Sequence, residues 1–124
     1  MFDTTSQTHR AEEYFTAKNA FTTGPIEVNE QMERGDNLTI VDVRADEDFR
    51  KSHVPGAVNL PEHRWRTLQG LSKEGPNIIY CYSQTCHLAS RAAQLFAHEG
   101  YPVVEMEGGF EAWKEADLKV EKGS

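Results

Sequence analysis

The sequence has little of what marks secreted and membrane proteins. Only two of its 124 residues are cysteine, which suggests reduced thiols rather than a disulfide framework. No apolar run approaches the length needed to span a bilayer. The first ten residues lack the basic start and apolar stretch of a signal peptide. We therefore expect a cytoplasmic protein.

Positive charge is also scarce. Lys and Arg number 13 against 20 Asp and Glu, and the formal net charge is −7. An acidic surface opposes non-specific binding to nucleic acid or anionic lipid, so we expect neither as a partner. Any anion site has to be built locally. The chain also lacks internal repeats and low-complexity linkers, and its length fits one domain.

What the chain does contain is short strand patterns alternating with helix patterns. We expect strands near 38–43, 78–81 and 103–106, a turn that feeds a short strand within 54–60, and helices near 8–20, 25–35, 46–51, 62–71, 89–97 and 110–118. Such alternation predicts an α/β fold in which helices cover both faces of a parallel sheet. Ligands of such sheets bind at the carboxyl ends of the strands.

The N-terminal segment differs from the rest. Ala11, Tyr14, Phe15 and Lys18 recur at helical spacing, and we interpret this helix as a packing extension. We therefore divide the chain into an N-terminal helical extension, residues 1–22, and a main domain, residues 23–124.

The clearest chemical signal lies around Cys81. An apolar strand pattern ends at this cysteine, a polar loop comes next, and a helix pattern begins just after it. Backbone N–H groups of such a loop and the helix N-terminus can stabilise a thiolate, which is the reactive form of cysteine. We expect a nucleophilic thiolate with a modestly lowered pKa, lying in an open bowl lined by amides. The plain alternative is an inert cysteine at a strand end.

A second cysteine, Cys86, lies in the same loop. It is either a helix-start residue without a chemical role, or a thiol able to resolve a persulfide or sulfenic acid on Cys81 into a disulfide. A zinc site is a weaker alternative, because His87 is the only other local ligand. His87 could donate to a bound anion, and Arg91 could reach the same place from the next helical turn; both could equally be surface groups.

Four segments in order then resemble the rhodanese-like domain family. They are Ile40-Val41-Asp42-Val43-Arg44 with Glu47 and Phe49, His53 to Pro61, Ile79-Tyr80-Cys81, and Glu107-Gly108-Gly109-Phe110-Glu111-Ala112-Trp113. The resemblance implies a three-layer α/β domain with a central parallel sheet of about five strands. It also implies a cysteine that accepts sulfane sulfur as a persulfide and passes it to a nucleophile, with no metal or organic cofactor.

Carried over by position, the resemblance makes Cys81 the catalytic nucleophile. Asp42 and Arg44 resemble the family's buried acid and its basic neighbour, which hold the loops near the site, and Arg91 is a further supporting residue. The donor would be a small sulfur-containing anion such as thiosulfate, or a persulfide, and the acceptor a thiol, cyanide or a protein. The loop that would bind the substrate comprises Tyr82, Ser83, Gln84, Thr85, Cys86 and His87.

The loop departs from the family's common form. A glycine in its middle and an arginine near its end are replaced here by Gln84-Thr85 and Cys86. The phosphatases that share this fold have an arginine where this chain has His87, and a neutral imidazole does not replace a guanidinium fork. Three hypotheses remain open: a sulfurtransferase acting through a Cys81 persulfide, a non-catalytic binding or regulatory module, and a thiol redox protein using Cys81 and Cys86.

Overall fold

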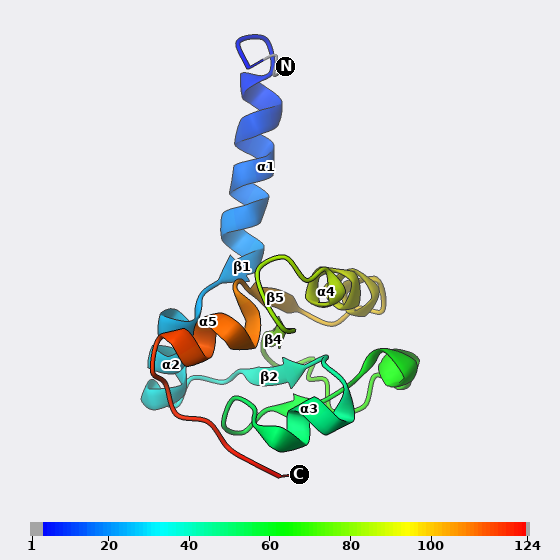
Figure 1. Cartoon of the computed structure of the whole chain (residues 1–124). Helices are drawn as coiled ribbons and strands as arrows, with labels where there is room; N and C mark the ends of the chain where they lie inside the picture. Colours follow the sequence, from blue (N-terminus) through cyan, green and yellow to red (C-terminus); the bar gives the residue numbers. More distant parts are fainter. Residues whose placement is uncertain (1–3, 124) are drawn as a thin grey trace.

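The computed structural model describes residues 4–123, which form a five-stranded sheet with helices on both faces (Figure 1). All strand pairs are parallel, in the order β1-β5-β4-β2-β3. The strands are β1 (Thr22–Thr23), β2 (Thr39–Asp42), β3 (Val58–Asn59), β4 (Asn77–Tyr80) and β5 (Val103–Met106). The helices are α1 (Thr8–Phe21), α2 (Pro25–Arg34), α3 (Asp46–Lys51), η1 (Glu62–Thr67, a 3-10 helix), α4 (Leu88–His98) and α5 (Gly109–Glu115).

Alternation along the two central strands creates two cores. Side chains of successive strand residues point to opposite faces. Val41 and Ile79 therefore join the core under α4 and η1, whereas Ile40 and Ile78 join the core under α2 and α5. The three-layer α/β fold predicted from the sequence is confirmed.

The fifth strand is the element that the sequence reading missed. Residues Thr22 and Thr23 look like the approach to a helix at Pro25, yet they form β1 and pair with Glu105 and Met106 of β5. Two residues are too few for a periodic pattern to show. The helix expected at 62–71 is also shorter, because η1 ends where Leu68 adopts a left-handed conformation with φ of 58°.

Helix α1 projects from the body of the domain, and no side chain of this helix is buried (Figure 1). Tyr14 is 60% exposed and Phe15 53% exposed. The interpretation of this helix as a packing extension is therefore wrong. Since β1 begins directly after α1 and pairs at the sheet edge, only the last helical turn reaches the body, where Lys18 lies 2.6 Å from Glu107.

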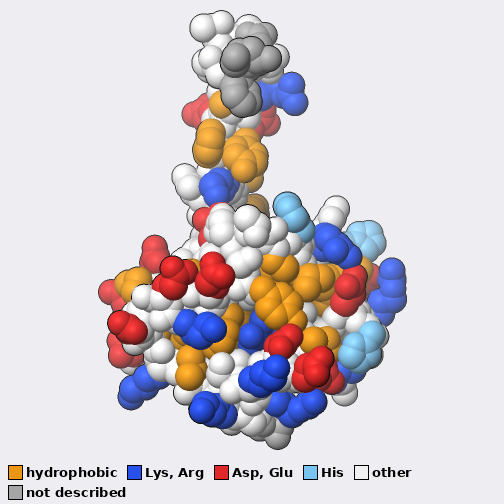
Figure 2. Space-filling model, in the orientation of Figure 1, with side chains coloured by type: hydrophobic (Ala, Val, Ile, Leu, Met, Phe, Trp, Pro, Cys, Tyr) orange, Lys and Arg blue, Asp and Glu red, His pale blue; other side chains and the backbone are white. Residues whose placement is uncertain are grey.

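The charged side chains are spread over the surface, and hydrophobic side chains gather on the visible face between α3 and α4 (Figure 2). Within residues 4–123, none of the helices combines the length and the apolar character needed to cross a bilayer.

Candidate active site

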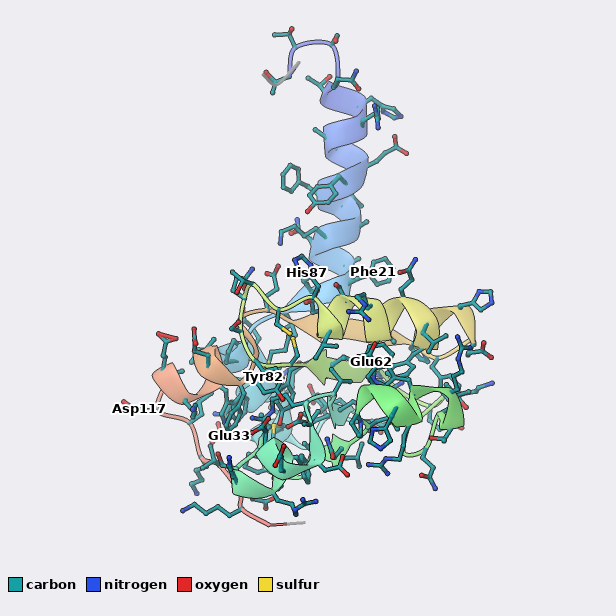
Figure 3. The ribbon with its side chains drawn as sticks, turned by 45° about the vertical axis from the view of Figure 1, so that its right-hand side comes forward. Phe21, Glu33, Glu62, Tyr82, His87 and Asp117 are labelled. Carbon is teal, nitrogen blue, oxygen red and sulfur yellow. The ribbon has the colours of Figure 1, made fainter. Side chains whose placement is uncertain are left out.

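The loop after β4 carries both cysteines and leads directly into α4 (Figure 3). Because β4 is the middle strand, this loop leaves the sheet at the carboxyl end between β5 and β2. The Cys86 N–H donates to the Ser83 carbonyl at 3.2 Å, which closes a turn between the two cysteines. The fold thus places both thiols at the edge of the sheet where parallel α/β proteins bind ligands.

The base of the loop is fixed by the start of α5. The Phe110 N–H donates to the Cys81 carbonyl at 2.9 Å, and the Glu111 N–H donates to the Tyr82 carbonyl at 3.0 Å. Gly109 permits this contact, since a Cβ at that position would lie 2.7 Å from the Cys81 carbonyl oxygen. Its φ of 60° is a second reason for glycine. The Gly108-Gly109 motif therefore positions the cysteine loop.

Cys81 is more enclosed than the sequence suggests. The residue is only 2% exposed and packs with Val43, Leu60 and Ala89 in the core beneath α4. Its Sγ lies 3.6 Å from the Cys86 carbonyl oxygen. Burial and the adjacent Cys86 thiol raise the pKa of Cys81 to about 11, although the backbone N–H groups of Ala89 and Tyr82 act in the opposite direction.

Two expectations for Cys81 are therefore wrong: its pKa is raised rather than modestly lowered, and the bowl around its sulfur is not open. The physical reason is the alanine-rich face of α4. Ala89 and Ala92 are fully covered, and their small side chains let the helix lie close over the strand end. The amides that were expected to line the site are nevertheless present, at Tyr82 and at the N-terminus of α4.

Cys86 is the more accessible thiol, and it is half-buried beside Cys81. Burial opposes its ionisation, but the hydrogen bond from the Cys81 thiol, the N–H groups of Leu88 and Tyr82, and the charge of Arg91 together lower the pKa of Cys86. The two thiols are hydrogen-bonded to each other, so the ionisation of one opposes the ionisation of the other. Cys86 therefore ionises before Cys81, which keeps its proton to higher pH.

The other loop side chains are arranged around this pair. The Ser83 and Thr85 hydroxyl oxygens lie 3.3 Å apart, and Gln84, Thr85 and His87 are exposed. The backbone of His87 caps α4, with its carbonyl accepting the Arg91 N–H at 3.1 Å. These residues present an outer polar surface, whereas the groups nearest the sulfurs are backbone amides.

Tyr82 links the loop to the next one along the sheet edge. Its hydroxyl donates to the Asp48 carboxylate at 2.6 Å and accepts the Ala45 N–H at 3.2 Å. The cysteine loop is thereby held against the segment that joins β2 to α3. The sequence gives no signal for this contact, because the partners are 34 and 37 residues away.

Asp42 and Arg44 form a buried ion pair below the loop, as the family resemblance implied. The guanidinium lies 2.8 Å from the carboxylate, and the Arg44 N–H donates to the same carboxylate at 2.9 Å. Tyr80, which sequence reading missed, donates its hydroxyl to Asp42 and accepts the Val54 N–H at 3.1 Å. Arg44 also donates to the Ser52 carbonyl at 2.7 Å, so the pair and Tyr80 join the ends of β2 and β4 to the loop after α3.

These contacts fix the protonation states of Arg44 and Tyr80. Burial acts against the charge of Arg44, yet the hydrogen bond and the attraction of Asp42 leave the pKa of Arg44 raised. Burial and the neighbouring Asp42 carboxylate raise the pKa of Tyr80. Both groups therefore keep their protons throughout the physiological range.

Arg91 does not reach the sulfurs. It is exposed and pairs with Glu62 of η1 at 2.7 Å, so its effect on the cysteine pair is that of a nearby charge. Glu62 and Tyr82 lie on the face that carries the cysteine loop (Figure 3).

A cavity of about 510 Å³ opens beside the loop. Tyr82 and Leu88, which flank the cysteine turn, form one wall of this cavity. The remaining lining residues are Val43, Ala45, Pro61, Glu62 and His63. Trp65 of η1 does not line the cavity: it is buried and donates its indole N–H to the Leu60 carbonyl at 3.0 Å.

No group of three or more His, Cys, Asp or Glu side chains within residues 4–123 is arranged to hold a metal ion. Cys81, Cys86 and His87 are close in sequence, but they do not make such a cluster. The arrangement suits thiol chemistry in which backbone N–H groups receive negative charge.

Comparison with known proteins gives one family. The model of the rhodanese-like domain matches residues 25–116. A thiosulfate sulfurtransferase, GlpE, of Shewanella oneidensis is 32% identical over 89 residues, which is 70% of this chain and 86% of that protein. An HTH-type transcriptional regulator of Mycobacterium tuberculosis is 31% identical over 88 residues, but the match spans only 39% of its length.

Solved structures agree with the fold. The BH2092 protein of Bacillus halodurans superposes with a TM-score of 0.83 at 30% identity, over 93% of this chain and 86% of that chain. A rhodanese-like domain protein of Staphylococcus aureus superposes with a TM-score of 0.72 at 24% identity, over 84% of this chain and 99% of that chain.

Proposed function

Because this chain belongs to the rhodanese-like domain family, we propose that it is a sulfurtransferase that carries sulfane sulfur as a persulfide on Cys81. One observation carries the proposal. A cysteine at the carboxyl end of the central strand lies beside a second thiol and beneath the backbone N–H groups of Tyr82 and Ala89. A persulfide anion needs such donors around its terminal sulfur.

The reaction begins with proton transfer inside the pair. Cys86, which ionises first, accepts the Cys81 proton in its thiolate form, and the Cys81 thiolate then attacks the outer sulfur of the donor. With thiosulfate, the new bond joins Cys81 Sγ to the sulfane sulfur, the S–S bond of the donor breaks, and sulfite leaves with the electron pair. A nucleophile such as an external thiol or cyanide then removes the terminal sulfur.

The cavity beside the loop supports a donor or acceptor larger than thiosulfate. Its volume of about 510 Å³ falls within the usual range for sites that bind organic molecules. The walls are mostly apolar, and the carboxylate of Glu62 is neutralised by Arg91. An organic persulfide or the cysteine segment of a protein acceptor fits such walls better than a small, strongly hydrated dianion does.

The burial of Cys81 favours a second candidate function, a non-catalytic binding or regulatory module. A thiol that is 2% exposed is poorly accessible in the resting state, and no arginine stands at the end of the loop. A match to one segment of a transcriptional regulator is compatible with this alternative.

A turnover assay separates the two functions. Thiocyanate formation from cyanide is measured with thiosulfate and, separately, with an organic polysulfide, for the wild type and for Cys81→Ser. A sulfurtransferase turns over at least one donor well above the variant, with the polysulfide preferred. Equal rates for both proteins with both donors would exclude the sulfurtransferase and favour the binding module.

A further inference from the structure

Persulfide transfer requires one cysteine, and this site holds two. Persulfide chemistry on Cys81 needs Cys86 at most as a base, yet Cys86 is held in direct contact with the first thiol. Its backbone turn is closed by the Ser83 carbonyl, and its side chain packs against the core cluster that contains Cys81. A second sulfur held at this place can take part in a covalent step.

The geometry points to Cys86 as a resolving thiol: we propose that Cys86 attacks the Cys81 persulfide, which releases hydrogen sulfide and leaves a Cys81–Cys86 disulfide. The inference rests on the proposed function, because it starts from the persulfide. It gives the protein a further activity, the reduction of sulfane sulfur to sulfide.

The step balances in atoms and electrons. Cys86 Sγ forms a bond to Cys81 Sγ, the bond from Cys81 Sγ to the terminal sulfur breaks, and that sulfur leaves as HS⁻ with the proton that Cys86 held. The two cysteine sulfurs are oxidised to a disulfide, and the sulfane sulfur is reduced to sulfide. An external thiol or dithiol then reduces the disulfide by exchange and restores the pair.

Three structural features favour the intramolecular attack. Cys81 Sγ already lies 3.6 Å from the Cys86 carbonyl oxygen, and the two thiols are close enough to share a hydrogen bond. Disulfides need Cα atoms within about 7 Å, and the closed turn between the cysteines keeps their backbones near one another. The enclosure of Cys81 slows the approach of any external nucleophile to its sulfur, whereas Cys86 already lies beside it.

Charge around the pair also permits the step. Arg91, on α4, is the nearby positive charge that favours a Cys86 thiolate, and it remains paired with Glu62 of η1. The amides of Tyr82, Leu88 and Ala89 surround the two sulfurs and can receive the negative charge that passes from Cys86 to the departing sulfide.

A single-turnover experiment tests the proposal. The reduced full-length protein, freed of small thiols and kept without oxygen, is mixed with one equivalent of an organic hydropersulfide, RSSH, whose outer sulfur passes to Cys81 as RS⁻ leaves. Sulfide release is measured, and the tryptic peptide Glu74–Arg91, which contains both cysteines, is weighed by mass spectrometry. A sample without donor controls for oxidation by air.

We expect the wild type to release about one sulfide per chain and its peptide to lose two hydrogens. Cys86→Ser should release at least about tenfold less sulfide and instead retain one extra sulfur on Cys81. Cys81→Ser should show neither product. Circular dichroism of both variants checks that they are folded. The wild-type measurement tests the proposal even if a variant fails to fold.

The outcomes distinguish this inference from the function on which it rests. A wild-type peptide that keeps an extra sulfur, without sulfide release or a disulfide, would overturn the resolving role and leave the sulfurtransferase intact. If neither the wild type nor Cys86→Ser gains sulfur or releases sulfide, the proposed function itself fails and the inference falls with it.

Discussion

At the scale of single residues, the central feature is the division of roles between two neighbouring thiols. Cys81 has the position that the sequence predicts, but its burial keeps it protonated. Cys86 is more exposed and ionises more readily. Cys86 is therefore the more reactive thiol in the resting protein, because it ionises more readily and is more accessible. The sequence alone pointed to Cys81 as the reactive cysteine.

Alkylation measures this division directly. With limiting iodoacetamide, Cys86 should be modified first at pH 7, and its rate should level off below the ordinary thiol pKa of 9.0. The rate at Cys81 should still increase as the pH approaches its raised pKa of about 11. Fragmentation of the Glu74–Arg91 peptide locates the label, and a reversed order of labelling would contradict the assignment.

The ion pair below the loop gives a second test at this scale. Asp42→Asn leaves the guanidinium of Arg44 buried without its counter-ion, and such losses destabilise by about 3–5 kcal/mol. The matched control is Asp36→Asn, which removes an exposed partner of Arg34 and should lower stability by less than about 1 kcal/mol. Urea unfolding of both variants provides the comparison, and equal losses would refute the structural role of Asp42.

Several features of the site could be read from the sequence, and others could not. The position of Cys81 is evident from local patterns: an apolar strand, a cysteine and a helix start. Its burial is not, since it depends on how closely Ala89 and Ala92 bring α4 over the strand end. Likewise, the acid and arginine two residues apart suggest an ion pair, but the Tyr80 hydroxyl that completes it comes from 38 residues away.

At the scale of elements, the cysteine loop is shaped by the turn and helix after β5. Two N–H groups at the start of α5 donate to the carbonyls of Cys81 and Tyr82, so α5 fixes the position of the loop relative to the sheet. The sequence marks this junction by two adjacent glycines, but the contact joins segments that are about 28 residues apart, as in Gly109 and Cys81. The two-residue strand β1 also could not be predicted from local sequence, because only its pairing with β5 makes it a strand.

A glycine substitution tests the junction. In Gly109→Ala the new Cβ would meet the Cys81 carbonyl oxygen at 2.7 Å, in addition to the strain of a φ of 60°. Gly35→Ala is the matched control, because its φ is 78° and a Cβ added there would meet no atom within 4 Å. The control should lose only the conformational term of about 1–2 kcal/mol.

Gly109→Ala should lose more stability than the control, measured by thermal unfolding, and should also change the alkylation rates of the two thiols. If both variants lose the same stability and leave the thiols unchanged, the close approach of α5 does not position the loop.

At the scale of the whole molecule, α1 stands apart from the cores. The superposition on the BH2092 protein covers 93% of the chain, whereas residues 23–124 are 102 of 124, so part of the projecting segment is shared with that structure. The sequence correctly indicates a helix there, because helical spacing is local. It misjudges the packing, because residues such as Tyr14 and Phe15 would look the same on a packed helix.

Truncation tests the division into an extension and a main domain, which stays a prediction. Removal of residues 1–20 retains β1 and both cores, and it deletes the half-exposed ion pair that joins Lys18 to Glu107. Since solvent-exposed ion pairs contribute little to stability, we expect the free energy of unfolding to stay nearly unchanged and the thiol reactivity to be retained. Urea unfolding and alkylation of the truncated protein check both, and an insoluble or unfolded product would show that α1 belongs to the folding unit.

The most direct test of the account is the location of the transferred sulfur. Cys86→Ser prevents resolution, so a persulfide should persist after treatment with an organic hydropersulfide, RSSH, and removal of excess donor. We predict that mass spectrometry of the Glu74–Arg91 peptide finds one additional sulfur atom, located on Cys81 and lost on treatment with a reductant. A peptide of unchanged mass, in a variant shown to be folded, would contradict the claim that Cys81 carries sulfane sulfur.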